Sequence, residues 1–337
     1  MFVHYFFAIM QIRTSFLTAL ALALVLPGQA RAQSSDAEFL ALLKAQKTSD
    51  VETLARERVS QNPKDDIAWS YLAQVVSGNA KKREEIRPGV EKCRAELPGS
   101  ARCHHAVGTL YAGVASSDGI TAALKYASNI KEGFAKAVEL DPKNYRMRRD
   151  LIQFYLQAPA LVGGSVRRAV ENANDFSKID PVRGLLLRAG VHVYEKEWDK
   201  AETLLSGIRT TDDLELPDLL TQANVSLGFA MIGDKQYARA KTVFERTVSA
   251  SPNTAIAHMG LGRALLEQKQ TDAAIATLER AIALDAKVGA HYRLSIAYEM
   301  KGDKQKAIAA LEQFLSYRAA GPGVDEAKKR LANMRQG

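Results

Sequence analysis

Two cysteines and two histidines in one short stretch are the residues whose types first suggest chemistry. Cys93 and Cys103 are ten residues apart, with Pro98-Gly99-Ser100 between them. The segments on either side of this turn are expected to be helices, and antiparallel helix ends joined by so short a turn lie within disulfide reach. The pair therefore predicts a disulfide in an exported protein, with two separately buried thiols as the alternative. There is no Cys-x-x-Cys, so a redox site is not expected.

The run Cys103-His104-His105 has the residue types of a metal site but not the spacing. Consecutive helical residues point about 100° apart and cannot easily converge on one ion. We therefore predict no metal site. The other histidines considered lie far apart, without the neighbours of a catalytic triad: His192, His258 and His291.

Known catalytic and cofactor motifs are missing from the sequence. It has no phosphate loop of the Walker type, no His-Glu-x-x-His and no Gly-x-Ser-x-Gly. We therefore expect no cofactor and predict that the protein is not an enzyme. The 337 residues carry 46 basic and 38 acidic side chains, a net charge of +8. The basic residues are scattered without a basic run, so we expect no nucleic-acid partner.

An arginine cluster and a glycine-rich turn suggest a second kind of chemistry, the binding of an anion. The cluster consists of Arg146, Arg148 and Arg149, and the turn is Gly163-Gly164-Ser165. Free backbone N–H groups at the start of a helix bind anions, and arginines nearby would add charge. A capped, extended loop is the simpler interpretation of the turn, and we favour it.

The first thirty-two residues have the pattern of a secretory signal peptide. Arg13 precedes an apolar run from Thr14 to Leu26, and Ala30-Arg31-Ala32 forms a small-x-small cleavage site. Cleavage would leave Gln33 first, and Met10 would make a more ordinary start than Met1. An uncleaved anchor is the alternative. We predict export to the periplasm or outside the cell, with no transmembrane segment in the mature chain.

A repeat with a period near thirty-four residues occupies the C-terminal third. Leu227-Gly228, Leu261-Gly262 and Leu294-Ser295 are spaced by 34 and 33 residues. Twelve residues after each small residue comes an alanine, and four later a large apolar residue. The small residue lets a second helix approach closely, and Gly233-Asp234 and Gly302-Asp303 are expected to turn the chain between helices, the glycine at positive φ.

This spacing resembles the tetratricopeptide repeat, in which helical hairpins stack into a superhelix. The resemblance implies an all-α, right-handed superhelical solenoid of about eight hairpins with a C-terminal capping helix. We expect divergent hairpins over 33–209 and regular repeats within 210–337, at about 221–252, 255–286 and 288–319. Phe134 to Pro142 resembles the end of such a repeat. An insertion at 115–119 and a lengthened second helix come before it, so this hairpin departs further from the repeat pattern.

The resemblance implies that His104 packs where the repeat often has an aromatic residue. In this repeat family the first helices line a concave groove, and the resemblance also implies which residues face it. In the N-terminal half they are His105, Arg146, Arg149 and Gln153; in the C-terminal half they are Phe229, Met259, Arg263, Tyr292, Arg293 and Ile296. Each of these could equally be a solvated surface position. The mixture suits a peptide with apolar anchors and some negative charge.

We therefore predict an exported scaffold or adaptor that binds a protein or peptide partner in cell-envelope assembly or secretion. The alternative is a periplasmic protein that binds a carbohydrate or an anion through Arg146, Arg148, Arg149 and the Gly163-Gly164-Ser165 turn. Nothing in the sequence sets the oligomeric state.

Overall fold

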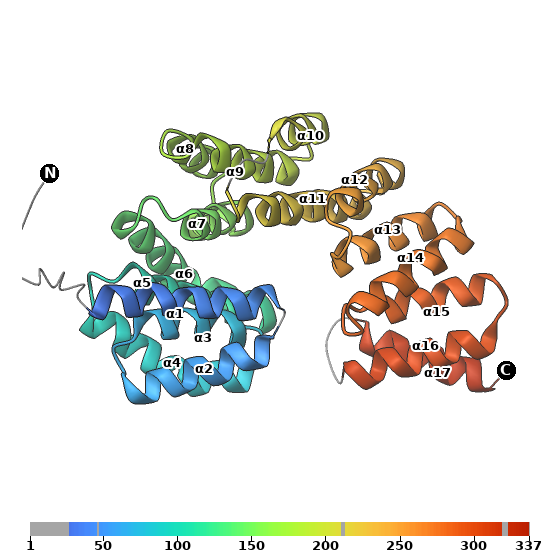
Figure 1. The fold of residues 1–337 in the computed structure, drawn as a ribbon, viewed down its shortest axis with the longest axis horizontal. Helices are drawn as coiled ribbons and strands as arrows, with labels where there is room; N and C mark the ends of the chain where they lie inside the picture. Colours follow the sequence, from blue (N-terminus) through green and yellow to red (C-terminus); the bar gives the residue numbers. More distant parts are fainter. Residues whose placement is uncertain (1–26, 46, 210–212, 319–322, 337) are drawn as a thin grey trace, which may run out of the picture.

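Helical hairpins make up the whole of the described chain. The computed structural model describes residues 27–45, 47–209, 213–318 and 323–336, with side chains from residue 36 onward. Within these ranges there are seventeen α-helices, one short 3-10 helix and no strand. The first sixteen α-helices form eight successive antiparallel pairs, and the last covers the end of the stack (Figure 1).

The N-terminal four hairpins contain the longest helix and the 3-10 helix. Their helices are α1 (Pro27–Lys44), α2 (Thr48–Gln61), α3 (Asp66–Val76), α4 (Ala80–Glu96), α5 (Ala101–Ser117), α6 (Gly119–Leu140), α7 (Tyr145–Gln157) and α8 (Val166–Ser177), with η1 (Ala160–Val162) between the last two. Residues 1–26, with Met10 and most of the predicted signal peptide, lie outside the described residues. The predicted cleavage point before Gln33 falls within α1.

The remaining helices continue the stack to its C-terminal end. They are α9 (Pro181–Tyr194), α10 (Trp198–Gly207), α11 (Leu216–Gly233), α12 (Tyr237–Ala250), α13 (Ala255–Glu267), α14 (Thr271–Leu284), α15 (Ala290–Met300), α16 (Lys304–Tyr317) and α17 (Val324–Gln336). The hairpins follow an arch, with α7 to α12 at its top and the two ends of the chain below (Figure 1).

Side-chain caps fix where four of the first helices, α3, α5, α7 and α9, begin. Asp65 accepts a hydrogen bond from the Ala68 N–H at 2.9 Å, which satisfies one of the free donors of the first turn. In two of these helices a ring nitrogen in the first turn contacts the carbonyl oxygen of the preceding proline. Trp69 Nε1 lies 2.9 Å from the Pro63 carbonyl oxygen, and His104 Nε2 lies 3.0 Å from that of Pro98.

His258 repeats this contact in the C-terminal half, 2.9 Å from the Pro252 carbonyl oxygen. His104 thus occupies the aromatic position of its repeat, as the sequence predicted.

The two helices of a hairpin approach closely where one of them has a glycine in place of a larger side chain. A Cβ atom at Gly228 would lie 2.6 Å from the Phe244 ring, and one at Gly262 would lie 2.6 Å from Leu278, so the predicted packing role of both glycines is confirmed.

The turns inside the hairpins differ from the prediction at one point. Gly233 was expected to take the positive φ of its turn, but it ends α11 and Lys235 has the positive φ, at 60°. Lys196 and Lys269 take the corresponding position in their hairpins, with φ of 59° and 60°. Gly302 does so in the last hairpin, at 75°, as expected. A lysine bears the steric cost of this conformation that glycine avoids.

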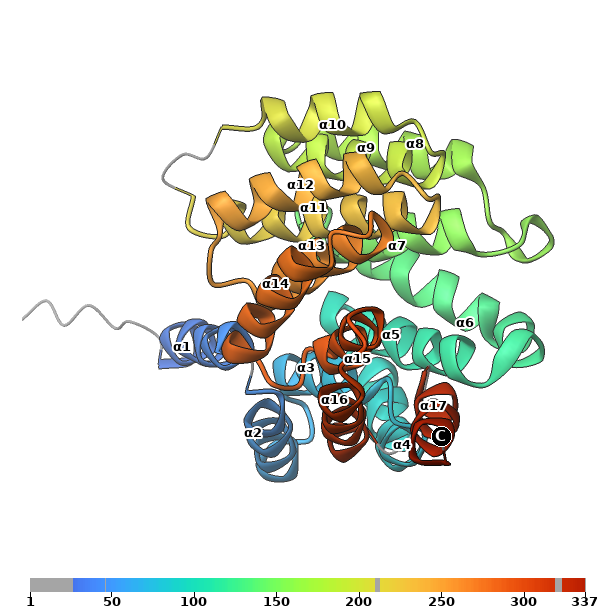
Figure 2. The same ribbon diagram turned by 90° about the vertical axis from the view of Figure 1, so that its right-hand side faces the viewer.

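The N-terminal half departs from the regular repeat in three places. Helix α6 has 22 residues, and a loop with η1 replaces the short turn after α7. Cys93 and Cys103 are joined by a disulfide between α4 and α5, with Cα atoms 5.6 Å apart and both side chains buried. Figure 2 shows the α5–α6 turn and the loop after α7 extending on the same side of the stack.

Candidate functional site

The concave side of the arch contains a basic pocket that several first helices build together. Its cavity has a volume of about 390 Å³. Helix α1 closes it on one side and α11 on the other, and the ion pair between Lys44 and Asp218, at 3.2 Å, joins these helices. The lining contains five cationic side chains, Arg102, Lys143, Arg146, Arg149 and Arg183, and three carboxylates, Asp36, Asp180 and Glu215.

Most of these arginines are already paired with carboxylates. Arg102 lies 2.9 Å from Asp36, and Arg183 lies 3.1 Å from Asp180. Arg146 instead donates to the Gln74 side-chain oxygen at 2.7 Å and lies over the Tyr71 ring, 5.8 Å from its centroid. It has no carboxylate partner in the part of the chain that the structure describes, so among the four arginines of the pocket its charge is the most available to a ligand.

Two residues of this pocket, the buried His105 and the half-buried Arg149, hold the carboxylate of Asp150 between them. The His105 ring is 6% exposed, with Nε2 2.9 Å from Asp150, and Arg149 lies 3.0 Å from the other oxygen of the same carboxylate. Burial works to raise the pKa of Asp150, but the hydrogen bond from His105 and the charge of Arg149 hold it below its ordinary value. His105 therefore serves mainly as a support for Asp150, with little surface left for a partner.

An apolar pocket of about 510 Å³ continues from the basic one along α7, α9 and α11. The two share Tyr145, Arg149, Leu219 and Gln222 in their walls. The second pocket adds apolar side chains, including Ile152, Leu186, Leu187 and Val193. Together the two pockets form what we call the concave groove, positive at one end and apolar at the other.

The structure thus brings the four predicted N-terminal groove residues together. His105 and Arg146 line the basic pocket, Arg149 lines both pockets, and Gln153 lines the apolar one. The acidic side chains of the groove were missed because Asp36 and Glu215 come from α1 and α11, which the repeat pattern does not place beside each other.

The predicted C-terminal residues are spread over α11, α13 and α15 and are mostly packed against neighbours. Phe229 meets the Phe244 ring edge-on at 5.1 Å, and the Tyr292 ring lies 5.4 Å from that of Phe314. Met259 packs partly buried against the core, and Ile296 is half-buried.

Two arginines in this region lie close enough to repel each other. Burial lowers the pKa of Arg293, and the charge of Arg263 lowers it further. The guanidinium of Arg293 lies over the Tyr292 ring, 5.5 Å from its centroid.

The predicted anion site of the alternative hypothesis is not formed. Arg148 is buried and donates to Asn172 at 2.9 Å, on the side of α8, away from the pocket that Arg146 and Arg149 line. At the turn, Ser165 accepts from the Arg168 N–H at 3.3 Å and caps α8. The capped loop is therefore the correct interpretation of this turn.

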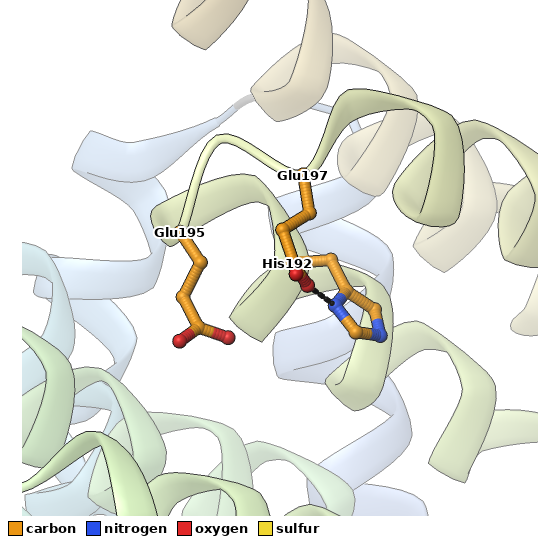
Figure 3. A group of neighbouring side chains, drawn as sticks. All are labelled: His192, Glu195 and Glu197. Atoms are coloured by element: carbon orange, nitrogen blue, oxygen red, sulfur yellow. Dashed lines mark hydrogen bonds and ion pairs between the residues drawn. The ribbon is translucent and has the colours of Figure 1, made fainter.

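The structure also contains a group of metal-ligating residue types that the sequence analysis did not single out. His192, Glu195 and Glu197 place ligand atoms within 4.8 Å of one another at the α9–α10 turn (Figure 3). His192 Nδ1 already lies 2.6 Å from a Glu197 oxygen, and Lys200 lies 2.6 Å from the other. These contacts lower the pKa of Glu197, with the hydrogen bond from Lys200 as the largest cause. The carboxylate thus already has two partners, the His192 ring and the Lys200 ammonium.

The fold defines the protein as an all-α solenoid of stacked hairpins, and the comparisons identify the repeat. The tetratricopeptide repeat family matches residues 234–288 and 270–325. No curated protein matches the chain. Yeast Tom70 superposes with a TM-score of 0.59 at 14% identity, over 86% of this chain and 59% of its own. Residues 234–325 thus match the tetratricopeptide repeat, and the predicted all-α solenoid of about eight hairpins with a capping helix is confirmed for the described residues.

Two further solved structures are similar over part of their length. A chain of the APC/C hetero-tetramer Cut9-Hcn1 matches with a TM-score of 0.46 at 16% identity, over 84% of this chain and 52% of that chain. YrrB, described as a TPR protein with an unusual peptide-binding site, matches with a TM-score of 0.38 at 18% identity, over 59% of this chain and 99% of that chain. The chain thus spans little more than half of the Cut9-Hcn1 chain and of Tom70.

The described helices were also considered as membrane spans. None of them combines the length and the apolar character that crossing a bilayer requires.

Proposed function

We propose that the protein is an exported, non-enzymatic scaffold whose concave groove binds an acidic peptide segment with apolar anchors. The observation that carries the proposal is the continuity of the basic pocket with the apolar one through Tyr145, Arg149, Leu219 and Gln222. An extended segment would place a carboxylate near Arg146 and apolar side chains between α9 and α11. The repeat family supports a role in protein interaction.

Export and a role in envelope assembly or secretion belong to the same proposal. Their support is the sequence pattern before Gln33 and the Cys93–Cys103 disulfide, a bond that persists in oxidising compartments. Mass spectrometry of the protein from a bacterial periplasm tests export, because cleavage should give a chain that begins at Gln33. An intact N-terminus in the periplasmic fraction would contradict the cleaved signal.

Selection from a displayed library of random twelve-residue peptides tests the groove directly. We expect the recovered peptides to combine acidic and large apolar residues, and their affinity to fall as salt concentration rises. Recovery of basic or purely polar peptides would contradict the proposal.

Two charge changes in the groove, each with a matched control, locate the binding site. Arg146→Gln and Gln222→Glu should each weaken a selected acidic peptide by about 3- to 10-fold, or roughly 0.7–1.4 kcal/mol. Arg167→Gln and Gln236→Glu make the same changes at exposed positions outside the groove and should leave affinity unchanged. Equal loss in variants and controls would place the peptide elsewhere.

A further inference from the structure

A second cavity of about 780 Å³ lies where the chain departs from the regular repeat. It is bounded by α5, α6 and α7 and by the loop after α7, and its volume is within the range of roughly 300–1,000 Å³ found for small-molecule sites. The first turns of α6 and the η1 loop both extend beyond the regular hairpins on this side (Figure 2). The cavity shares Gln153 with the apolar pocket of the concave groove but no residue with the basic pocket.

One wall of the cavity is a continuous apolar face of α6. Its residues are spaced by three and four: Ile120, Ala123, Ala127, Ile130 and Phe134. At 1.5 Å per residue this face is roughly 20 Å long. Phe134 is buried at one end and Ile120 is 67% exposed at the other, so the face leads from the interior to the surface. The wall is therefore long and narrow, which matches an extended chain better than a compact ring.

The opposite wall, on α7, carries the polar groups. Asp150, Gln153 and Gln157 lie on one face of that helix, and the Gln157 side-chain nitrogen donates to the Gln153 oxygen at 3.0 Å. The Asp150 carboxylate already interacts with His105 and Arg149. The two amides therefore offer hydrogen bonds to an uncharged group, and the described lining has no cationic side chain that could pair with an anionic one.

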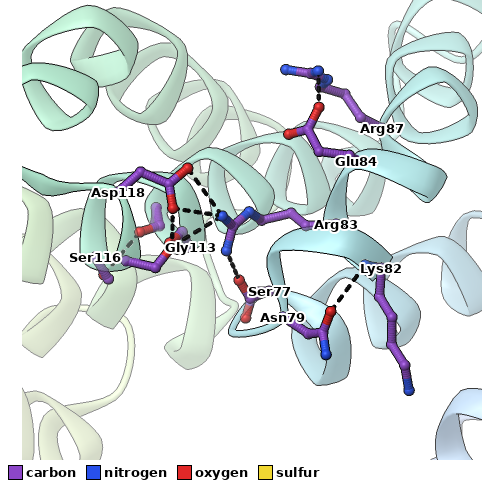
Figure 4. A network of polar contacts seen from close by, with 11 residues as sticks. Ser77, Asn79, Lys82, Arg83, Glu84, Arg87, Gly113, Ser116 and Asp118 are labelled. Carbon is purple, nitrogen blue, oxygen red and sulfur yellow. Dashed lines mark hydrogen bonds and ion pairs between the residues drawn. The ribbon is translucent and has the colours of Figure 1, made fainter. Parts of the chain in front are cut away.

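A buried arginine fixes one end of the cavity. Arg83 is 1% exposed, with Nη1 2.6 Å from the Ser77 carbonyl oxygen and Nη2 2.9 Å from Ser117 Oγ and 3.1 Å from Asp118 (Figure 4). Ser77 and Ser117 both line the cavity, one from the turn after α3 and one from the end of α5. These contacts hold the two turns at a set distance, so the cavity is formed before any ligand arrives.

We propose that this cavity binds an amphiphile with a single aliphatic chain and an uncharged polar head. The chain lies along the α6 face, and the head group accepts and donates hydrogen bonds at Gln153 and Gln157. One apolar side chain of a protein partner would fill only a small part of the volume. This site is additional to the concave groove and does not depend on the peptide proposal.

Calorimetric titration of the whole protein with monolauroylglycerol, below its aggregation concentration, tests the proposal. We expect saturable binding with one ligand per chain. Ala123→Trp fills the cavity and should weaken binding at least about tenfold, or 1.4 kcal/mol. Thr121→Trp adds the same ring at an exposed position of the same helix outside the cavity and should not. No saturable binding, or equal binding by both variants, would overturn the proposal.

Protection from alkylation gives a result that does not depend on the folding of the filled variant. Ser116 lines the cavity and is exposed, so Ser116→Cys should react more slowly when monolauroylglycerol is present. Thr121→Cys should react at the same rate with and without it. Equal rates at position 116 would overturn the site, and laurate binding as tightly as monolauroylglycerol would overturn the assignment of an uncharged head.

Discussion

The two halves of the solenoid organise their cores differently. In the N-terminal half, one cluster of buried side chains runs from Phe39 to Val191 without a break. From Leu186 to Ala327 the buried side chains fall into three smaller clusters, each shared by neighbouring hairpins. The regular half repeats one kind of contact between helices, in which a small residue on one helix packs against a large apolar side chain on the other. The irregular half adds a disulfide, a buried arginine and a lengthened helix.

This difference bears on which parts of the molecule stabilise the fold and which parts can bind ligands. Regular hairpins fit their neighbours closely, because a glycine or serine on one helix meets a large apolar side chain on the next. The cavity along α6 arises where the fit is broken by the longer α6 and the η1 loop. We conclude that this departure from the repeat adds enclosed space to the groove that the first helices form.

The largest expected effect tests whether the C-terminal clusters are independent of the N-terminal one. Phe244 is fully buried against Gly228 and Gly260, so Phe244→Ala should lower the free energy of unfolding by about 3–5 kcal/mol. Hydrogen exchange should show faster opening of α11 to α14 with α3 to α6 still protected. Uniform loss of protection would contradict the comparison, and the exposed change Thr242→Ala serves as the control.

The disulfide should matter less than that aromatic ring. Replacing both Cys93 and Cys103 by alanine frees a ten-residue loop, and we expect a loss of about 2–3 kcal/mol in urea unfolding. Reduction of the unaltered protein should have a similar effect, and reductant should leave the double variant unchanged. An unaltered unfolding midpoint would show that the N-terminal cluster does not rely on this bond.

Arg83→Met keeps most of the side-chain volume and removes the polar contacts to Ser77, Ser117 and Asp118. We expect a loss of about 1–2 kcal/mol, because the Ser77 carbonyl oxygen loses its charged donor. Asp118→Asn should cost less, since that side chain is 43% exposed. An increase in stability would show that burying the arginine costs more than its contacts return.

The smallest effect is expected at the turns of the regular half. Lys269→Gly removes the steric cost of a lysine at positive φ but raises the conformational entropy of the unfolded chain. The net gain in the free energy of unfolding should therefore be below about 1 kcal/mol. Gly302→Ala is the opposite change at the corresponding position and should lower the melting temperature. Changes of the same sign in both variants would contradict the equivalence of these turns.

The sequence predicted the regular half in more detail than the irregular one, for a physical reason. Gly228 and Gly262 report on contacts within and between neighbouring hairpins, which the spacing encodes directly. The sequence shows the insertion at 115–119 and the Gly163-Gly164-Ser165 turn, but the cavity beside them depends on two segments that are distant in sequence. The error at Gly233 has a local cause, because α11 runs two residues further than a positive φ at Gly233 would require and the turn position therefore falls on Lys235.

The candidate site was predicted in part. Arg146, Arg149 and Gln153 were found because they follow the frame of the first helices. Arg148 was grouped with them only because it is adjacent in sequence, and its position on the helix turns it toward Asn172 instead. The carboxylates from α1 and α11 were not predictable from the repeat, because the curvature of the whole arch brings them there.

The protein has two tryptophans, and both lie before the regular repeats. Trp69 is in α3, where its indole meets Pro63, and Trp198 begins α10; each is 9% exposed. Trp198 belongs to a core cluster that extends into α11, α12 and α13. Tryptophan fluorescence therefore reports on the helices up to α13 and not on the last four, whereas circular dichroism detects all of the helices. The difference between the unfolding midpoints seen by fluorescence and by circular dichroism therefore measures how strongly the unfolding of one end of the arch is coupled to that of the other.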